Sequence, residues 1–285
     1  MIRRALLVFG VAAALCFGIT GCDGTPGHGF GEGIAESIGL ADPKPMPPIL
    51  VDALCDSSDG ASCTAATLRE LIDNILPVIA ERPGSILRIW SLGDDLPSTT
   101  IIATSVNTRR TALSGRVERS AQTRFVAEET AFLMKAVMSI FSATRPRQSP
   151  IAEGIGRIAL AHAAPGVLHL YVVLSDGLQF SHALGDDFEC GTLPAASAWS
   201  SRLAAEQVFA AGALRNSAIA FTHVTPVPIA RKGCPKASLA RFGQVRNLWT
   251  TALTAAGARK VVFETGALDI NDYVERNHAI GGGAL

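Results

Sequence analysis

The chain has 285 residues, of which 48% are hydrophobic, and its 25 basic and 25 acidic side chains give a formal net charge of zero. A neutral chain has no overall electrostatic attraction for nucleic acid, so charge excludes that class of partner. The length exceeds that of an average domain, but a single α/β domain often reaches about 200 to 250 residues. We therefore expect one sizeable core.

The first 21 residues are typical of a secretory signal, because Arg3 and Arg4 precede a short apolar stretch that closes with the letters ITGC. This ending resembles the lipobox of bacterial lipoproteins, which implies that Cys22 becomes the N-terminus of the mature chain and carries acyl chains such as palmitate. Asp23 resembles the signal that keeps lipoproteins at the periplasmic face of the inner membrane. An uncleaved anchor and an ordinary signal peptide are the alternatives.

The next segment, residues 22–47, is rich in glycine and proline, which is typical of a tether. The letters PPILVDAL then predict an apolar strand that ends at Asp52, and Thr64 is placed to cap the helix that follows. Two strands begin at Ser85 and Ser98 and are separated by a short turn. This spacing predicts an antiparallel hairpin.

Helices and strands alternate through the rest of the chain. The predicted helices and strands cover residues 124–143 (helix), 149–164 (helix), 167–174 (strand), 195–214 (helix), 217–227 (strand), 236–258 (helix) and 259–265 (strand). This alternation predicts an α/β fold with three layers, a mostly parallel central sheet, helices on both faces and one antiparallel edge strand. We expect the domain to span residues 48–264 and the remainder, 265–285, to form a frayed tail.

The strand from Val167 to Leu174 is apolar throughout and is followed at once by Ser175, Asp176 and Gly177. Such strands are typical of parallel sheets, which bind ligands at the carboxyl ends of their strands. Asp176 is therefore expected to serve a ligand site. The alternative is that its side chain only caps the next turn.

The directions of the predicted elements place Asp52, Ser149 and Asp176 at one edge of the sheet. The order of elements, with its hairpin between the second and third strands, resembles the von Willebrand factor type A domain. That resemblance implies a metal-ion-dependent adhesion site with Asp52 as the first Asp of an Asp-x-Ser-x-Ser motif, Ser149 in place of a Thr, and Asp176 as the last Asp. Oxygen ligands of this kind suit Mg²⁺.

The first motif departs from the family pattern, because Leu54 stands where the first Ser is expected. Asp56, or the serines that follow it after a small shift of the loop, is the expected substitute ligand. Arg145 and Arg147 lie in a turn at the same edge and provide the alternative, in which a guanidinium neutralises the carboxylates and the degenerate site holds no metal.

Four cysteines remain after the signal and Cys22 are set aside. In an oxidising compartment they predict two disulfides with three possible connectivities. Cys55 and Cys63 are eight residues apart in one loop, so we pair them, which leaves Cys190 with Cys234.

Together these features favour a membrane-tethered module of the bacterial envelope that docks a protein partner at the strand edge. We do not expect an enzyme, because the sequence shows no credible nucleophile with a paired base. The alternatives are a small-ligand-binding domain and a hydrolase that uses Asp56 or Asp176 as its base.

Overall fold

The computed structural model divides the chain into two units, Met1–Asp42 and Pro43–Leu285, and all the residues that it describes lie in the second unit. The described residues are 46–58, 62–95, 97–109, 115–143, 145–161, 167–224 and 239–281. The predicted signal, Cys22, most of the tether and Cys234 lie outside these ranges.

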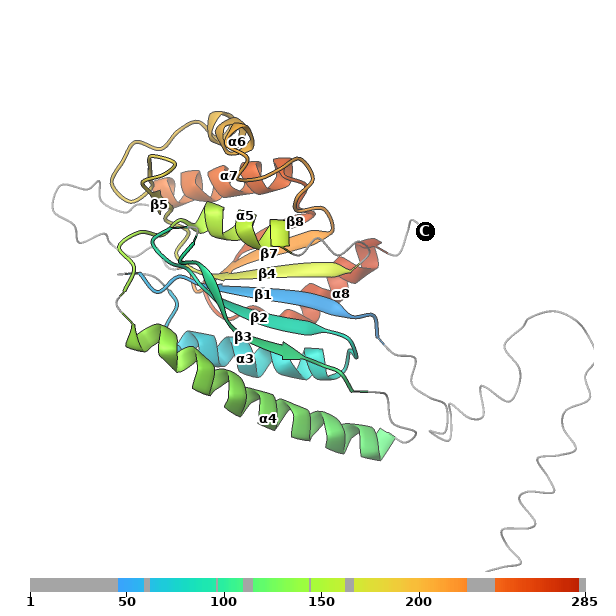
Figure 1. Cartoon of the computed structure of the whole chain (residues 1–285). Coiled ribbons are helices and arrows are strands. Elements are labelled where there is room, and N and C mark those ends of the chain that lie inside the picture. The colour runs from blue at the N-terminus through green and yellow to red at the C-terminus, as the bar shows by residue number, and fades with distance from the viewer. Residues whose placement is uncertain are drawn as a thin grey trace, which may run out of the picture. The chain divides into compact units, whose positions relative to one another are not determined.

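A six-stranded sheet forms the middle layer of the second unit (Figure 1), in the order β3-β2-β1-β4-β7-β8. Its strands are β1 (Ile49–Cys55), β2 (Ile86–Ser91), β3 (Thr100–Val106), β4 (Leu168–Leu174), β7 (Ser217–Thr222) and β8 (Lys260–Phe263). Neighbouring strands are parallel except for β2 and β3, which are antiparallel. A separate two-stranded ribbon joins β5 (Phe180–Ser181) to β6 (Asp186–Asp187). The α/β class and the antiparallel edge strand predicted from the sequence are confirmed.

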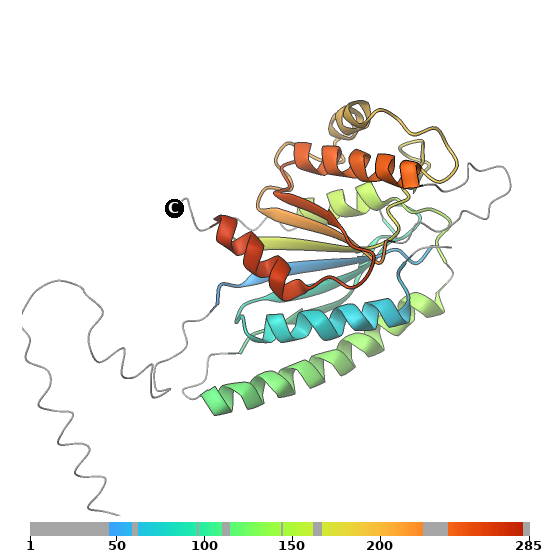
Figure 2. The same cartoon turned by 180° about the vertical axis from the view of Figure 1, so that it is seen from behind.

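Helices cover both faces of the sheet (Figures 1 and 2). One face carries α3 (Ala65–Ala80), α4 (Gly115–Ser142) and α8 (Ile270–Gly281), and the other carries α5 (Ile151–Ala161), α6 (Ala196–Ala205) and α7 (Leu239–Ala255). Each face of the sheet has its own apolar core, so the layers number three, as predicted. Among the described helices, none has both the length and the apolar character needed to cross a membrane.

The two central strands explain the apolar runs in the sequence. Every residue of β1 and of β4 is buried, because helices cover the sheet on both sides. The parallel register pairs Cys55 with Leu174, so β1 and β4 end at the same level. The chain segments that begin at Asp56 and Ser175 therefore leave the sheet side by side.

The structure corrects four predicted boundaries. Helix α6 ends at Ala205, although a helix was predicted as far as residue 214, because residues 206–214 form turns and bends. Strand β1 does not end at Asp52 but continues to Cys55, which places Asp52 inside the sheet. Helix α4 begins at Gly115, nine residues before the predicted start, because its first turns are polar and carry no apolar period. Residues 270–281, expected to be part of a frayed tail, form α8, which buries Tyr273 and Val274 against the core.

Candidate functional site

Asp52 does not reach the edge of the sheet. Its carboxylate is fully buried and accepts hydrogen bonds at 2.7 Å from both Nε and Nη2 of Arg88, and another at 2.6 Å from Nε1 of Trp90. His169 Nε2 contacts the same carboxylate. Burial alone would raise the pKa of Asp52, but the hydrogen bonds and charges of His169 and Arg88 hold it below its usual value. The predicted role of Asp52 as a metal ligand is therefore corrected, because both oxygens belong to an internal ion-pair network.

Asp56 takes the place at the edge that was predicted for Asp52. It is the first residue after β1, it is 1% exposed, and its backbone N–H donates to the carbonyl of Leu174 at the end of β4. Its Oδ1 accepts hydrogen bonds from the backbone N–H of Ser58 at 3.1 Å and from the Ser58 hydroxyl at 2.7 Å. Asp56 and Ser58 thus have the Asp-x-Ser spacing that the family resemblance requires, four residues later than predicted, with Gly60 at the third position.

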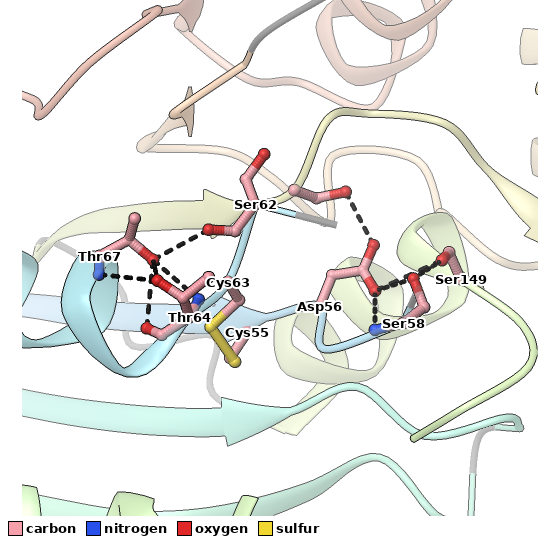
Figure 3. Close-up of a disulfide and its surroundings, with 9 residues drawn as sticks. Cys55, Asp56, Ser58, Ser62, Cys63, Thr64, Thr67 and Ser149 are labelled. Atoms are coloured by element: carbon pink, nitrogen blue, oxygen red, sulfur yellow. Dashed lines mark hydrogen bonds between the residues drawn. A yellow bond between two sulfur atoms is a disulfide. The ribbon is translucent and has the colours of Figure 1, made fainter. Parts of the chain in front are cut away.

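Ser149 joins this pair from a distant part of the chain. Two backbone hydrogen bonds link Ser149 to Phe180 just before α5 begins, at 2.9 and 3.0 Å. Its Oγ lies 2.7 Å from Oγ of Ser58 and donates to Oδ1 of Asp56 at 3.3 Å. Figure 3 shows the three side chains facing one another across the loop. The structure therefore places Ser149 at the predicted edge.

Asp176 lies two residues after the end of β4, and its carboxylate takes part in a turn and is also affected by the charge of Asp56. Its Oδ1 accepts a hydrogen bond from the backbone N–H of Leu178 at 2.9 Å, which is the turn-capping role considered as an alternative. Burial and then the charge of Asp56 raise the pKa of Asp176 to about 7. Gly177 lets the chain turn away sharply, because its φ of 79° lies in the left-handed region that favours glycine. The Asp176 side chain thus caps a turn, and its pKa is also raised by the charge of Asp56.

Sequence reasoning missed Ser175, the residue between the end of β4 and Asp176. It is fully buried, and its hydroxyl donates to Oδ2 of Asp56 at 2.9 Å. The signal was available in the sequence, because a Ser that directly follows a buried strand lies at the same edge as the carboxylate after it. The edge site, as we define it, consists of Asp56, Ser58, Ser149, Ser175 and Asp176.

The edge site has negative charge without a positive partner in the described part of the chain. Burial raises the pKa of Asp56, although three serine hydroxyls donate to its carboxylate. Among the described residues, no basic side chain forms an ion pair with Asp56 or Asp176. The backbone N–H of Arg147 donates to Asp94, outside the edge site. Among the described residues, therefore, no ion pair supports the predicted neutralisation of the edge carboxylates by Arg145 or Arg147.

The donor set fits a hard divalent cation. Mg²⁺ in proteins is usually bound by one or two carboxylates and keeps several waters, and hydroxyl oxygens are compatible with it. No group of three or more His, Cys, Asp or Glu side chains suited to a metal occurs among the described residues. The edge site offers two carboxylates and neighbouring hydroxyls, which is the chemistry of an oxygen-ligated ion and not of a zinc site.

The disulfide between Cys55 and Cys63 is confirmed, and it closes the loop that carries Asp56 and Ser58 (Figure 3). Cys190 is also disulfide-bonded. Its predicted partner Cys234 lies outside the described residues.

No protein-family model and no curated protein matches the chain. Among solved structures, it is similar to the conserved hypothetical protein BatB from Bacteroides thetaiotaomicron, with 10% identity, 84% of this chain and 100% of that chain covered, and a TM-score of 0.39. It is also similar to an aerotolerance-related membrane protein from Bacteroides fragilis, with 10% identity, 83% and 97% covered, and a TM-score of 0.34.

Proposed function

We propose that the edge site binds Mg²⁺ and that the bound ion helps to dock a protein partner. The observation that carries the proposal is the convergence of Asp56 and Asp176 with three serine hydroxyls, at a place where no ion pair to either carboxylate is present among the described residues. Two carboxylates in such a place repel one another unless a cation or a shared proton intervenes. A divalent cation removes this repulsion and suits the oxygen donors present.

Each residue of the edge site has a role in this proposal. Asp56 and Asp176 supply the negative charge, and Ser58 and Ser149 supply hydroxyl oxygens. Ser175 holds the Asp56 carboxylate in place by donating to Oδ2. An acidic side chain of the partner would complete the coordination of the ion, as the resemblance to von Willebrand factor type A domains implies.

The sequence supports a location for this module. The ITGC ending of the signal is the basis for proposing that Cys22 is acylated and that the domain is tethered to the envelope membrane, on the periplasmic side. A tethered domain meets its partner at the membrane surface, where a short tether keeps the effective concentration high. We therefore propose an envelope lipoprotein whose folded domain docks another envelope protein.

Thermal unfolding with and without Mg²⁺ tests the metal proposal. A ligand that binds only the folded state raises the melting temperature by mass action, so saturating Mg²⁺ should stabilise the wild type. Asp56→Asn and Asp176→Asn should each abolish most of this response. Asp73→Asn is the matched control, because Asp73 lies on the exposed face of α3 and, among the described residues, forms an ion pair only with Arg69. An unresponsive wild type, or an equal response in Asp56→Asn, would refute the proposal.

Crosslinking in the native membrane tests the docking proposal. The wild-type chain should recover a discrete partner protein in the presence of Mg²⁺, and both Asp56→Asn and removal of the metal by a chelator should reduce that recovery. Equal recovery with Asp56→Asn would show that the edge site is not the docking surface. Turnover of a substrate by the purified domain would instead support the hydrolase alternative.

A further inference from the structure

We infer that the Cys55–Cys63 disulfide positions Asp56 and Ser58 for metal binding, so that opening it weakens Mg²⁺ binding while the sheet stays folded. The inference rests on the proposed function and concerns the same edge site. It assigns the disulfide a role in the site in addition to any contribution to stability.

The disulfide joins two rigid elements. Cys55 is the last residue of β1 and is fully buried, and Cys63 immediately precedes Thr64, the N-cap of α3. Asp56 and Ser58 lie in the short loop between the two cysteines, as Figure 3 shows. Both candidate ligands therefore belong to a small covalent ring whose ends are set by a buried strand and a capped helix.

The end of the loop at α3 is fixed in a second way. Thr64 and Thr67 form a reciprocal capping box, and Oγ1 of Thr67 also donates to the carbonyl of Ser62 at 2.9 Å. The Ser62 hydroxyl in turn donates to the carbonyl of His223, just beyond β7, at 2.7 Å. These contacts hold the base of the ring against two elements of the fold.

Ser58 itself has a different set of contacts. All its hydrogen bonds within the described residues go to Asp56 and Ser149, which are themselves candidate ligands. A metal ion that took up the oxygens of Ser58 and Ser149 would replace their mutual contact. The covalent ring is then the main constraint on where Ser58 lies.

The other half of the edge site needs no such ring. Ser149 is held by its two backbone hydrogen bonds to Phe180, and Gln179 ties the same segment to α5 by accepting from the backbone N–H of Ala152 at 2.9 Å. Gln179 also donates to buried Glu153 at 2.7 Å. Secondary structure and buried side chains therefore position Ser149. Asp56 is also held by its backbone bond to Leu174 and by the Ser175 hydroxyl, and the disulfide adds a covalent constraint on the loop that carries both Asp56 and Ser58.

The Cys55→Ala/Cys63→Ala double variant tests the inference. Freeing two ligand side chains that must be ordered again on binding should weaken Mg²⁺ affinity by about tenfold, which isothermal titration calorimetry measures. In the absence of metal, the backbone amide of Ser58 should exchange its hydrogen faster, while amides in β1 and β4 keep their protection. Val137→Ala is the control, because Val137 is fully buried in α4, on the face of the sheet covered by α3, α4 and α8. Val137→Ala should lower the melting temperature without changing the Mg²⁺ affinity or the hydrogen exchange of the Ser58 amide.

The possible results separate the two proposals. A wild type that binds Mg²⁺ and a double variant that binds it equally well would overturn the role of the disulfide and leave the proposed function standing. A wild type that binds no Mg²⁺ would overturn the proposed function. It would also overturn the role of the disulfide in metal binding, because that role depends on the proposed function. Should the double variant fail to fold, reduction of the folded Cys190→Ala variant with tris(2-carboxyethyl)phosphine gives the comparison, because Cys190 is also disulfide-bonded and its disulfide would otherwise be reduced at the same time.

Discussion

At the scale of single residues, two aspartates four positions apart have opposite electrostatic surroundings. Asp52 lies opposite Arg88 in the parallel register of β1 and β2, and its pKa is lowered by His169 and Arg88 against the effect of burial. Among the described residues, the donors to Asp56 are hydroxyl and amide groups, and burial raises the pKa of Asp56. The first arrangement stabilises the fold, and the second leaves a charge that a ligand can satisfy.

Asp52→Asn should destabilise the protein by about 3 to 5 kcal/mol, because it leaves the buried guanidinium of Arg88 without its partner. Since the pKa of Asp52 is lowered in the folded state, its stabilising effect is present above the usual pKa of an aspartate and is lost as the pH falls through the folded value. Urea unfolding at neutral and acidic pH measures both effects. Asp272→Asn, in an exposed pair with Arg276, should change stability by less than about 1 kcal/mol. Equal effects of the two substitutions would contradict the buried network.

The raised pKa of Asp176 predicts that its contribution to stability changes with pH in the direction opposite to that of Asp52. Its pKa of about 7 in the folded state is raised, so the folded protein binds the proton more tightly than the unfolded chain does. The resulting stabilisation is complete below the usual pKa of an aspartate, and it is lost as the pH rises from about 4 to about 7. Asp176→Asn should flatten the stability profile over this interval without metal. An unchanged profile in that variant would show that another group causes it.

At the scale of elements, α5 matters most for the edge site, because Ser149 lies two residues before its first residue, Ile151. The helix packs closely against its neighbours at two glycines: a Cβ at Gly156 would lie 2.3 Å from the carbonyl oxygen of Val208, and one at Gly154 would lie 2.8 Å from the side chain of Leu92. Close packing of α5 thus helps to fix the position of Ser149.

Gly156→Ala should therefore destabilise the protein by about 1 to 3 kcal/mol, because the clash with the Val208 carbonyl outweighs the gain in helix propensity. Gly243 in α7 is the matched control, since a Cβ there would meet nothing within 4 Å. Gly243→Ala should stabilise by up to about 1 kcal/mol. Chemical unfolding of the two variants gives the comparison, and effects of the same sign would argue against close packing at α5.

The sequence predicted most elements, and the misses have physical causes. Alternation of apolar strands with amphipathic helices indicated the sheet and its hairpin. The end of β1 was misplaced because a carboxylate inside a buried strand is expected only with a charged partner, and Arg88 lies in the next strand, where no local pattern reveals it. Helix α8 was missed although Ile270, Tyr273 and Val274 have helical spacing, because few apolar residues surround them.

At the scale of the whole molecule, the edge site draws its residues from three distant segments that the sheet brings together. Strand directions predicted that Asp52, Ser149 and Asp176 share an edge, and Asp56 was expected only as a substitute ligand, because Leu54 stands where the family resemblance implies a Ser. It could not fix which Asp of the first loop reaches the edge, since that depends on where β1 ends. The contacts of Ser175 and Ser58 depend on side-chain geometry that only the folded structure provides.

The domain is also longer at its C-terminus than the sequence predicted. Deletion of residues 267–285 removes α8 and with it the buried side chains of Ile270, Tyr273 and Val274. Each such side chain contributes about 1.5 to 3 kcal/mol when fully buried, so the shortened chain should lose several kcal/mol in guanidinium unfolding. A chain that ends at Gly281 is the control and should keep its stability. Equal stability of both shortened chains would show that α8 is dispensable.

Anomalous X-ray diffraction from crystals soaked in Mn²⁺ tests the central claim most directly, because manganese prefers the same oxygen ligands as Mg²⁺ and can be located by its own signal. An anomalous peak is expected within bonding distance of oxygens from Asp56, Ser58 and Ser149, with Asp176 nearby. Crystals of Asp56→Asn should lack that peak. A well-diffracting wild-type crystal with no peak at the edge site, or with a peak only elsewhere on the domain, would show that the edge site does not bind the ion.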